Sequence, residues 1–233
     1  HLMMNLVKRL ELNKEIIALS PKVMFADKPN VIWFGGAKIG NNLKFQKQCA
    51  NDICGKVDSH KFKGLIDTDA IVGCASIMKS KHLKKSGLSD KDFFYGEEDI
   101  ELSDRLKKTS GKIVVDLDQK IYHSVSHTVG ANWAKNIYYN YKYRLLLLKK
   151  IGTWSDKFIG YNVFLLKFFF MIMLSFNLKY SSKLIPVLLA GFHFMQKKYG
   201  DYDRKHYKKI NDFFLMFNKQ TSLIRIFKIF IKN

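Results

Sequence analysis

The 233-residue sequence has few cysteines and few acidic residues. Its three cysteines, Cys49, Cys54 and Cys74, form no repeated C-x-x-C spacing, which argues against a disulfide framework and against a structural zinc site. We therefore expect loop or core thiols at Cys49 and Cys54, and a reducing compartment. The residues that follow His1 form a charged amphipathic stretch, which is not the pattern of a signal peptide.

The shortage of negative charge is the second absence. Only 20 Asp and Glu residues oppose 40 Lys and Arg residues, so the formal charge is +20. This balance favours a polyanionic partner or an anionic surface, such as nucleic acid or the cytoplasmic leaflet of a membrane. Hydrophobic residues form 47% of the chain, which excludes disorder in bulk and allows one large domain or two small ones. No internal repeat or low-complexity tract stands out.

The order of expected elements is mixed α and β up to Gly130 and helical after it. We therefore predict two domains, residues 1–130 and 131–233. Hydrophobic spacing and turn residues predict the following elements: helices over 2–13, 79–88, 133–151 and 221–233, a helix that begins in the acidic stretch near residue 98, strands over 15–25, 31–34, 112–116 and 121–123, and a loop-rich stretch over 38–63.

The most informative stretch runs from Phe93 to Arg105. Four carboxylates, those of Glu97, Glu98, Asp99 and Glu101, lie within five positions at the head of this helix. Crowded carboxylates bind a cation, accept a proton or face water. A carboxylate that faces a cavity can take a proton from an alcohol at about 2.6–3.2 Å. The alternative is a solvated helix start that stabilises the helix dipole.

Several segments in a fixed order resemble the family 2 glycosyltransferases of the GT-A fold, in particular rhamnosyltransferases. The resemblance covers residues 2–143, and more loosely extends to residue 200. The segments that carry it are Ser20–Val23, Gly35–Gly36, Asp69–Ala75, Ser86–Asp90, Phe93–Leu102, Gly111–Ile113 and His123. It implies part of a GT-A mixed sheet, followed by a helical, membrane-associated region.

The resemblance also implies a reaction, an inverting transfer of a sugar from a nucleotide-sugar donor to a hydroxyl of a polysaccharide or lipid-linked acceptor. Asp99 would be the general base and Glu98 its supporting partner. The acceptor would meet the residues Gly73, Cys74, Tyr95 and Arg105. A divalent metal, Mg or Mn, would stabilise the leaving diphosphate, with His123 as a ligand.

The family's nucleotide-binding half and its Asp-x-Asp metal motif should precede Leu2, so we expect the chain to start inside a longer reading frame. Asp67-Thr68-Asp69 has the letters of that motif. It lies in the wrong place, however, just before the segment that the resemblance associates with the acceptor. We interpret it as a coincidence or as a solvated turn. For His123, the alternative to a metal ligand is an ordinary histidine at a strand end. For His127, the ordinary histidine is the favoured interpretation.

The C-terminal region has long apolar stretches bordered by basic residues. Phe158–Leu178 approaches the length of a membrane span, but Lys167 lies near its middle and would be costly in lipid. An interfacial helix or hairpin on an anionic membrane surface is therefore expected, at the cytoplasmic face of the cell membrane. The alternative is a buried helix packed on the catalytic domain.

Two further functions stay open at this point. Tyrosines and lysines interleave over Tyr138–Arg144 and could stack on single-stranded nucleic acid. This second hypothesis leaves the acidic stretch unexplained, so no nucleic-acid partner is expected. The third hypothesis is a non-catalytic, membrane-associated subunit.

Overall fold

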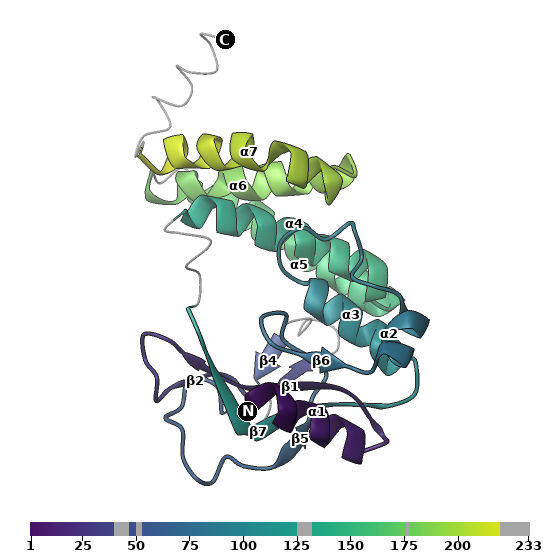
Figure 1. The fold of residues 1–233 in the computed structure, drawn as a ribbon. Helices are drawn as coiled ribbons and strands as arrows, with labels where there is room; N and C mark the ends of the chain where they lie inside the picture. Colours follow the sequence, from purple (N-terminus) through teal and green to yellow (C-terminus); the bar gives the residue numbers. More distant parts are fainter. Residues whose placement is uncertain (40–46, 50–52, 125–131, 176–177, 220–233) are drawn as a thin grey trace. The chain divides into compact units, whose positions relative to one another are not determined.

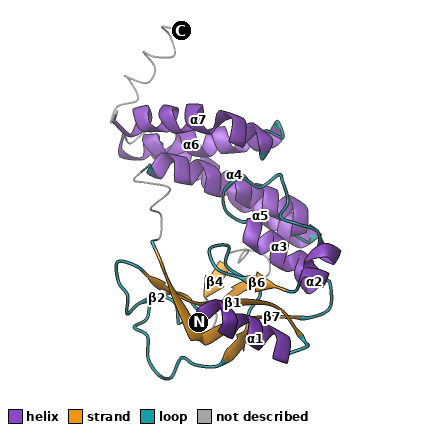
Figure 2. Ribbon diagram, in the orientation of Figure 1, coloured by secondary structure: helices purple, strands orange, loops and turns teal. Residues whose placement is uncertain are grey.

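The computed structural model describes residues 1–39, 47–49, 53–124, 132–175 and 178–219 (Figure 1). The chain divides into two compact units. The first contains His1–Asp90 and Glu98–Thr128, and the second contains Lys91–Glu97 and Val129–Asn233. The fold is mixed α/β (Figure 2). The expected boundary at Gly130 falls outside the described residues.

The first unit is built on a five-stranded mixed sheet with the order β2-β1-β7-β5, in which β6 also pairs with β1. β1 and β7 are parallel, whereas β2, β5 and β6 join them antiparallel. The strands are β1 (Ile16–Phe25), β2 (Ile32–Phe34), β5 (Leu65–Asp67), β6 (Ile77–Met78) and β7 (Lys112–His123). β3 (Ala37–Ile39) and β4 (Lys47–Cys49) form a separate antiparallel pair.

Strand β1 is the centre of this unit because nine of its ten residues are buried. A continuous apolar run of this kind is typical of a strand covered on both faces. On one face Leu19 and Val114 pack with Leu6 and Leu10 of α1 (Leu2–Leu12). The other face is covered by α3 (Glu98–Lys107), together with Leu83 of the short helix α2 (Ser80–Ser86); the residues of this cluster are Ile17, Ala18, Ile71, Leu102, Leu106 and Ile113.

The sequence predicts two strands where the structure has one, so that prediction is wrong. β7 is continuous, but its register against β1 shifts: Pro21 pairs with Asp116, and Lys22 pairs with Lys120. Pro21 has no N–H to donate to a ladder, which favours an irregularity at its position. At this irregularity, Arg9 of α1 contacts Asp116 at 3.2 Å and Asp118 at 2.6 Å.

One cysteine also differs from expectation. Cys54 is disulfide-bonded, so the prediction of a thiol at this position is wrong. An odd total of three cysteines still permits one bridge.

The second unit consists of helices α4 (Trp133–Ile151), α5 (Trp154–Ser175), α6 (Leu178–Met195) and α7 (Asp201–Lys219), together with the 91–97 segment. The prediction of a helix over 133–151 is confirmed. α4 forms the core and packs against the other three helices. Its most buried large side chains are Tyr138, Tyr139, Lys142, Tyr143 and Leu146.

Local sequence signals fix the helix starts in this unit. Asn132 caps α4 by accepting a hydrogen bond from the Lys135 N–H at 3.2 Å. At the start of α5, Thr153 and Asp156 form a reciprocal pair: Asp156 Oδ2 accepts from the Thr153 N–H, and Thr153 Oγ1 accepts from the Asp156 N–H. Such capping boxes satisfy backbone donors that the helix itself leaves open.

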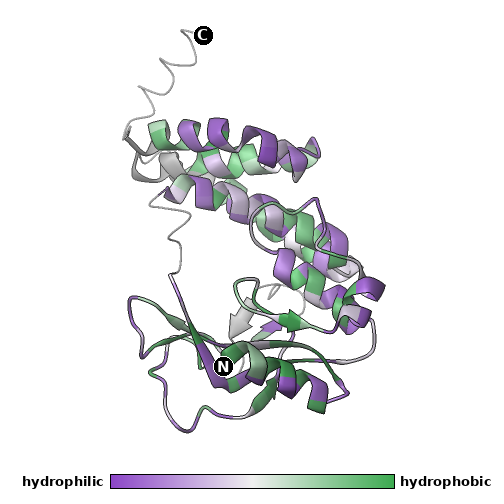
Figure 3. Cartoon of the chain, viewed as in Figure 1, coloured by the Kyte–Doolittle hydropathy of each residue, from purple (hydrophilic) through white to green (hydrophobic). Residues whose placement is uncertain are grey.

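Hydropathy alternates along α7, as Figure 3 shows. Ile210 and Phe214 are buried, and Lys205, Lys208 and Lys209 are exposed. None of the described helices is both long and apolar enough to cross a membrane. The helix expected over 221–233 falls in a part of the chain that is not described.

Candidate active site

The four crowded carboxylates do not act as one cluster, because two of them bind different cations. Glu97 belongs to the helical unit, where its Oε1 lies 3.0 Å from the guanidinium of Arg144. Glu101 is buried on α3 and pairs with Arg105 at 2.7 Å. Glu98 and Asp99 begin α3 in the sheet unit, and Asp99 Oδ1 accepts the Ile100 N–H at 2.9 Å.

Gly73 lies directly beside the Glu98 and Asp99 side chains. A Cβ atom at Gly73 would be 3.6 Å from Glu98 Oε1 and 3.9 Å from Asp99 Cβ. Gly73 and its neighbour Cys74 are both exposed. The structure therefore brings together the acid pair and the segment that the resemblance associates with the acceptor.

Two buried serines hold this arrangement in place. Ser103 lies one turn after Asp99 on α3, and its hydroxyl donates to the Asp99 carbonyl. The same hydroxyl accepts the N–H of Ile71 at 3.0 Å. From β1, the hydroxyl of Ser20 accepts the N–H of Val72 at 3.3 Å. Hydrogen bonds in the core thus fix both the backbone just before Gly73 and the start of α3 at Asp99.

Arg105 is fully occupied within the sheet unit. Its Nε and one terminal nitrogen bind the two oxygens of Glu101 at 2.7 and 2.8 Å. The terminal nitrogens also donate to the carbonyls of Ser86, Gly87 and Leu88. These bonds match the five N–H groups of a guanidinium. The Glu101 carboxylate raises the pKa of Arg105 above its ordinary value. Where the sequence predicts an acceptor contact, the structure shows a side chain that holds the 86–88 turn against α3.

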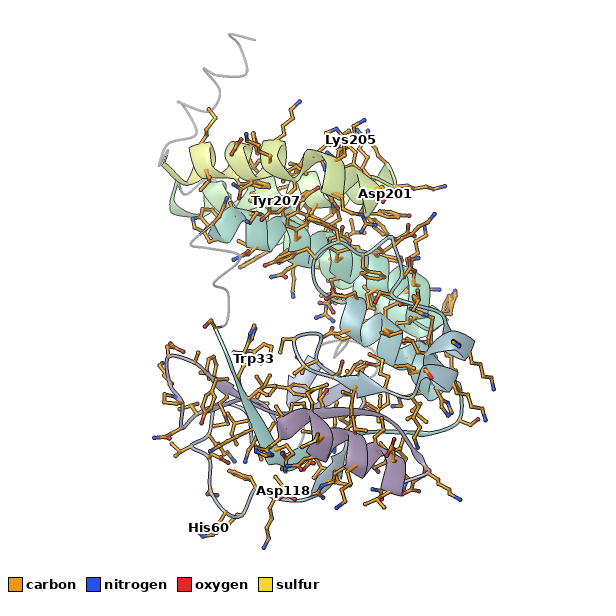
Figure 4. All side chains as sticks on the ribbon, in the orientation of Figure 1. Trp33, His60, Asp118, Asp201, Lys205 and Tyr207 are labelled. Carbon is orange, nitrogen blue, oxygen red and sulfur yellow. The ribbon has the colours of Figure 1, made fainter. Side chains whose placement is uncertain are left out.

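Tyr95 belongs to the helical unit, where its ring lies 5.1 Å from the ring of Tyr139. The two preceding aromatic residues are anchored in the same way. Phe93 packs on Tyr143 at 5.7 Å, and Phe94 contacts Tyr207 of α7 at 5.5 Å (Figure 4). After this aromatic anchor, both Gly96 and Glu97 have positive φ, of 78° and 68°. The backbone therefore turns sharply just before the acid pair.

His123 is the last residue of β7, and its ring lies 4.9 Å from the ring of Trp33 (Figure 4). Its carbonyl accepts the N–H of Ala26, so the strand end is closed by a backbone hydrogen bond. This geometry matches the interpretation as a histidine at a strand end. His127 falls outside the described residues.

The Asp67-Thr68-Asp69 letters have a structural explanation. Thr68 Oγ1 is buried and accepts the Ala37 N–H at 2.8 Å, while Asp69 Oδ2 accepts the Ile39 N–H at 2.9 Å. Asp69 Oδ1 pairs with Lys107 of α3. Burial alone would raise the pKa of Asp69, but the Lys107 ammonium and the Ile39 N–H lower it below the ordinary value. The segment ties β3 to α3.

A metal site is not formed by these residues. Within the described ranges, no three His, Cys, Asp or Glu side chains lie close enough to hold a metal ion.

Some of the positioning residues were not predicted. Ser20 and Ser103 are separated by more than eighty positions in the sequence. Ser20 lies in a segment that carries the resemblance and Ser103 lies in the acidic stretch, but neither was selected as a site residue. The only sequence signal for Ser103 is its spacing of four residues from Asp99, which places it one helical turn away. No protein-family model matches the chain, and no curated protein sequence matches it.

Proposed function

We propose that this chain is the acceptor-side part of an inverting glycosyltransferase of the GT-A fold. The observation that supports the proposal is the approach of the exposed Gly73 segment to Glu98 and Asp99. A glycine at this point leaves room for an acceptor hydroxyl next to a carboxylate, where a side chain would fill the space. The donor is a nucleotide sugar. The acceptor is a glycan or a lipid-linked glycan.

Two other acids of the sheet unit, Glu101 and Asp69, are less suitable as a base. Glu101 is bound to Arg105 through both oxygens, and Asp69 is bound to Lys107 and a backbone N–H. Carboxylate oxygens that already accept these internal hydrogen bonds are not available to an acceptor hydroxyl. Asp99 and Glu98 are the carboxylates that lie beside the exposed Gly73 segment. This position favours Asp99 as the base and Glu98 as the group beside it.

In the proposed reaction an acceptor hydroxyl lies near Asp99, at about the distance of a hydrogen bond. Its oxygen attacks the anomeric carbon of the donor from the face opposite the leaving group. The bond from the anomeric carbon to the diphosphate oxygen breaks with its electron pair, and the glycosidic bond forms. The hydroxyl proton passes to Asp99. Glu98 contributes negative charge near the developing oxocarbenium character of the sugar.

The test is the release of nucleoside diphosphate by the complete reading frame that contains this chain, with an acceptor glycan present. Asp99→Asn removes the base and should lower kcat by about 10²–10⁴-fold, the usual contribution of a general base. Asp104→Asn is the matched control, because Asp104 lies on the same helix and pairs with Lys108 in a partly exposed ion pair. It should retain activity within about twofold.

The outcomes are distinct. Full activity of a folded Asp99→Asn protein would show that Asp99 is not the base. No transfer by the unmodified protein with any nucleotide sugar, combined with normal folding, would favour the non-catalytic subunit instead.

A further inference from the structure

Helix α5 exposes a broad apolar face. Six large side chains on it are at least 59% exposed: Trp154, Phe158, Leu166, Phe169, Phe170 and Met173. At about 100° per residue they cover one side of the helix. Asn162 lies among them, and its side-chain amide donates to the Phe158 carbonyl at 2.6 Å. Exposed apolar faces of this extent mark interaction sites on soluble surfaces.

The aromatic content of this face is high. The ring of Trp154, which is 81% exposed, stacks on that of Phe158 at 5.6 Å with an interplanar angle of 8°. The neighbouring helix α6 also exposes apolar side chains at helical spacing, namely Leu188, Phe192 and Met195. Tryptophan and phenylalanine are the side chains that interfacial helices place at the boundary between headgroups and acyl chains.

The charge of the helical unit complements an anionic surface. Residues 129–233 contain nineteen Lys and Arg residues against four Asp and no Glu. Two of these aspartates are buried in internal contacts: Asp203 pairs with Lys142, and Asp156 caps α5. On α7, Lys205 and its neighbours Lys208 and Lys209 are exposed (Figure 4). Lys167 is exposed beside the apolar face of α5.

We propose that α5 lies in the plane of an anionic lipid surface, with its exposed apolar face in the acyl boundary and Lys167 among the headgroups. Nucleic acid would satisfy the cations, but it would leave the aromatic face in water. A lipid surface satisfies both features. This inference concerns the helical unit alone and does not depend on the proposed reaction at Asp99.

The experiment uses the full chain and flotation with phosphatidylcholine vesicles, either pure or mixed with phosphatidylserine. The unmodified chain should float with the mixed vesicles, and less so at high salt. The triple variant Leu166→Gln, Phe169→Gln, Phe170→Gln should bind at least about tenfold more weakly. The matched control is Met3→Gln, Met4→Gln, Leu12→Gln, which removes three side chains of α1 that are 60%, 65% and 73% exposed. This control should float like the unmodified chain.

A second readout locates the contact. In a variant with Trp33 and Trp133 changed to Phe, the fluorescence of Trp154 should shift to the blue when mixed vesicles are added.

Absence of flotation by the unmodified chain would overturn the proposal, as would equal flotation of the α5 and α1 triple variants. Salt-sensitive RNA binding without flotation would assign the charge to nucleic acid. A dimer that the α5 triple variant dissociates, again without flotation, would assign the face to a second copy of the chain. An Asp99→Asn protein that floats normally but fails to transfer sugar separates this test from that of the reaction.

Discussion

Lys142 and Asp203 form an ion pair in which both side chains are completely buried. The ammonium lies 2.5 Å from each carboxylate oxygen and also donates to the Tyr138 hydroxyl at 2.7 Å. The Tyr143 hydroxyl donates to the same carboxylate. Burial lowers the pKa of Lys142 to about 8, against the opposing effect of the Asp203 charge. The pair joins α4 to α7, so it holds the helical unit together.

Removal of one partner should therefore be costly. Asp203→Asn leaves a buried ammonium without its counter-charge and should lower the free energy of unfolding by about 3–5 kcal/mol. Asp201→Asn is the control, because that side chain is 83% exposed at the start of the same helix. It should change stability by less than about 0.5 kcal/mol. Urea unfolding followed by circular dichroism measures both. A similar loss in the two variants would contradict the assigned role of the pair.

The buried network also predicts a dependence on pH through His193. The Tyr138 hydroxyl lies 2.7 Å from His193 Nδ1. Because Lys142 donates to Tyr138, the tyrosine proton points to the imidazole, which must then be neutral. Burial, together with the charge of Lys142, lowers the pKa of His193 from 6.5 to about 4.

A lowered pKa means that the unfolded chain binds the proton first as the pH falls. The contribution of His193 to stability is complete above about pH 6.5 and is lost as the pH falls towards 4. The loss amounts to at most about 3 kcal/mol. In His193→Asn, an amide oxygen replaces the acceptor and does not titrate. Between these pH values, the free energy of unfolding of this variant should depend less on pH than that of the unmodified protein. An unchanged pH dependence would show that groups other than His193 cause the loss of stability in acid.

Arg105 allows a test within the sheet unit. Arg105→Gln leaves the buried Glu101 carboxylate without its cation and removes the bonds to the 86–88 turn, so stability should fall by about 3–5 kcal/mol. Lys108→Gln breaks an ion pair whose side chains are 68% and 29% exposed, and it should cost less than about 1 kcal/mol. Trp33 fluorescence reports on this unit once Trp133 and Trp154 are changed to Phe. Arg105→Lys should recover only part of the loss, because an ammonium cannot bind both carboxylate oxygens in the same way.

Helices were predictable where apolar residues recur at helical spacing within the segment itself. The 133–151 helix has this pattern, and so does α1. The single strand β7 was not predictable from its own residues, because the irregularity depends on Pro21 of the parallel neighbour. Asp99 and Gly73 were selected through the resemblance and not from the pattern of their own residues. Their proximity depends on Ser103 and Ser20, which bond across the core. The role of Arg105 could not be predicted from the sequence, because the carbonyl groups that it binds lie in a turn that is distant in the sequence.

Gly73 provides the sharpest test of the proposed acceptor position. An alanine Cβ would meet only ordinary van der Waals distances, 3.6 Å to Glu98 Oε1 and 3.9 Å to Asp99 Cβ. Gly73→Ala should therefore keep the stability of the protein within about 1 kcal/mol. The methyl group would occupy the space beside Asp99, so kcat/KM for the acceptor should fall by about tenfold or more through misplacement of the hydroxyl. Gly64→Ala changes a glycine outside this site; it introduces backbone strain, because Gly64 has a φ of 81°, but it should leave kcat/KM of the folded protein unchanged. An active Gly73→Ala enzyme with the same KM for acceptor would place the acceptor elsewhere.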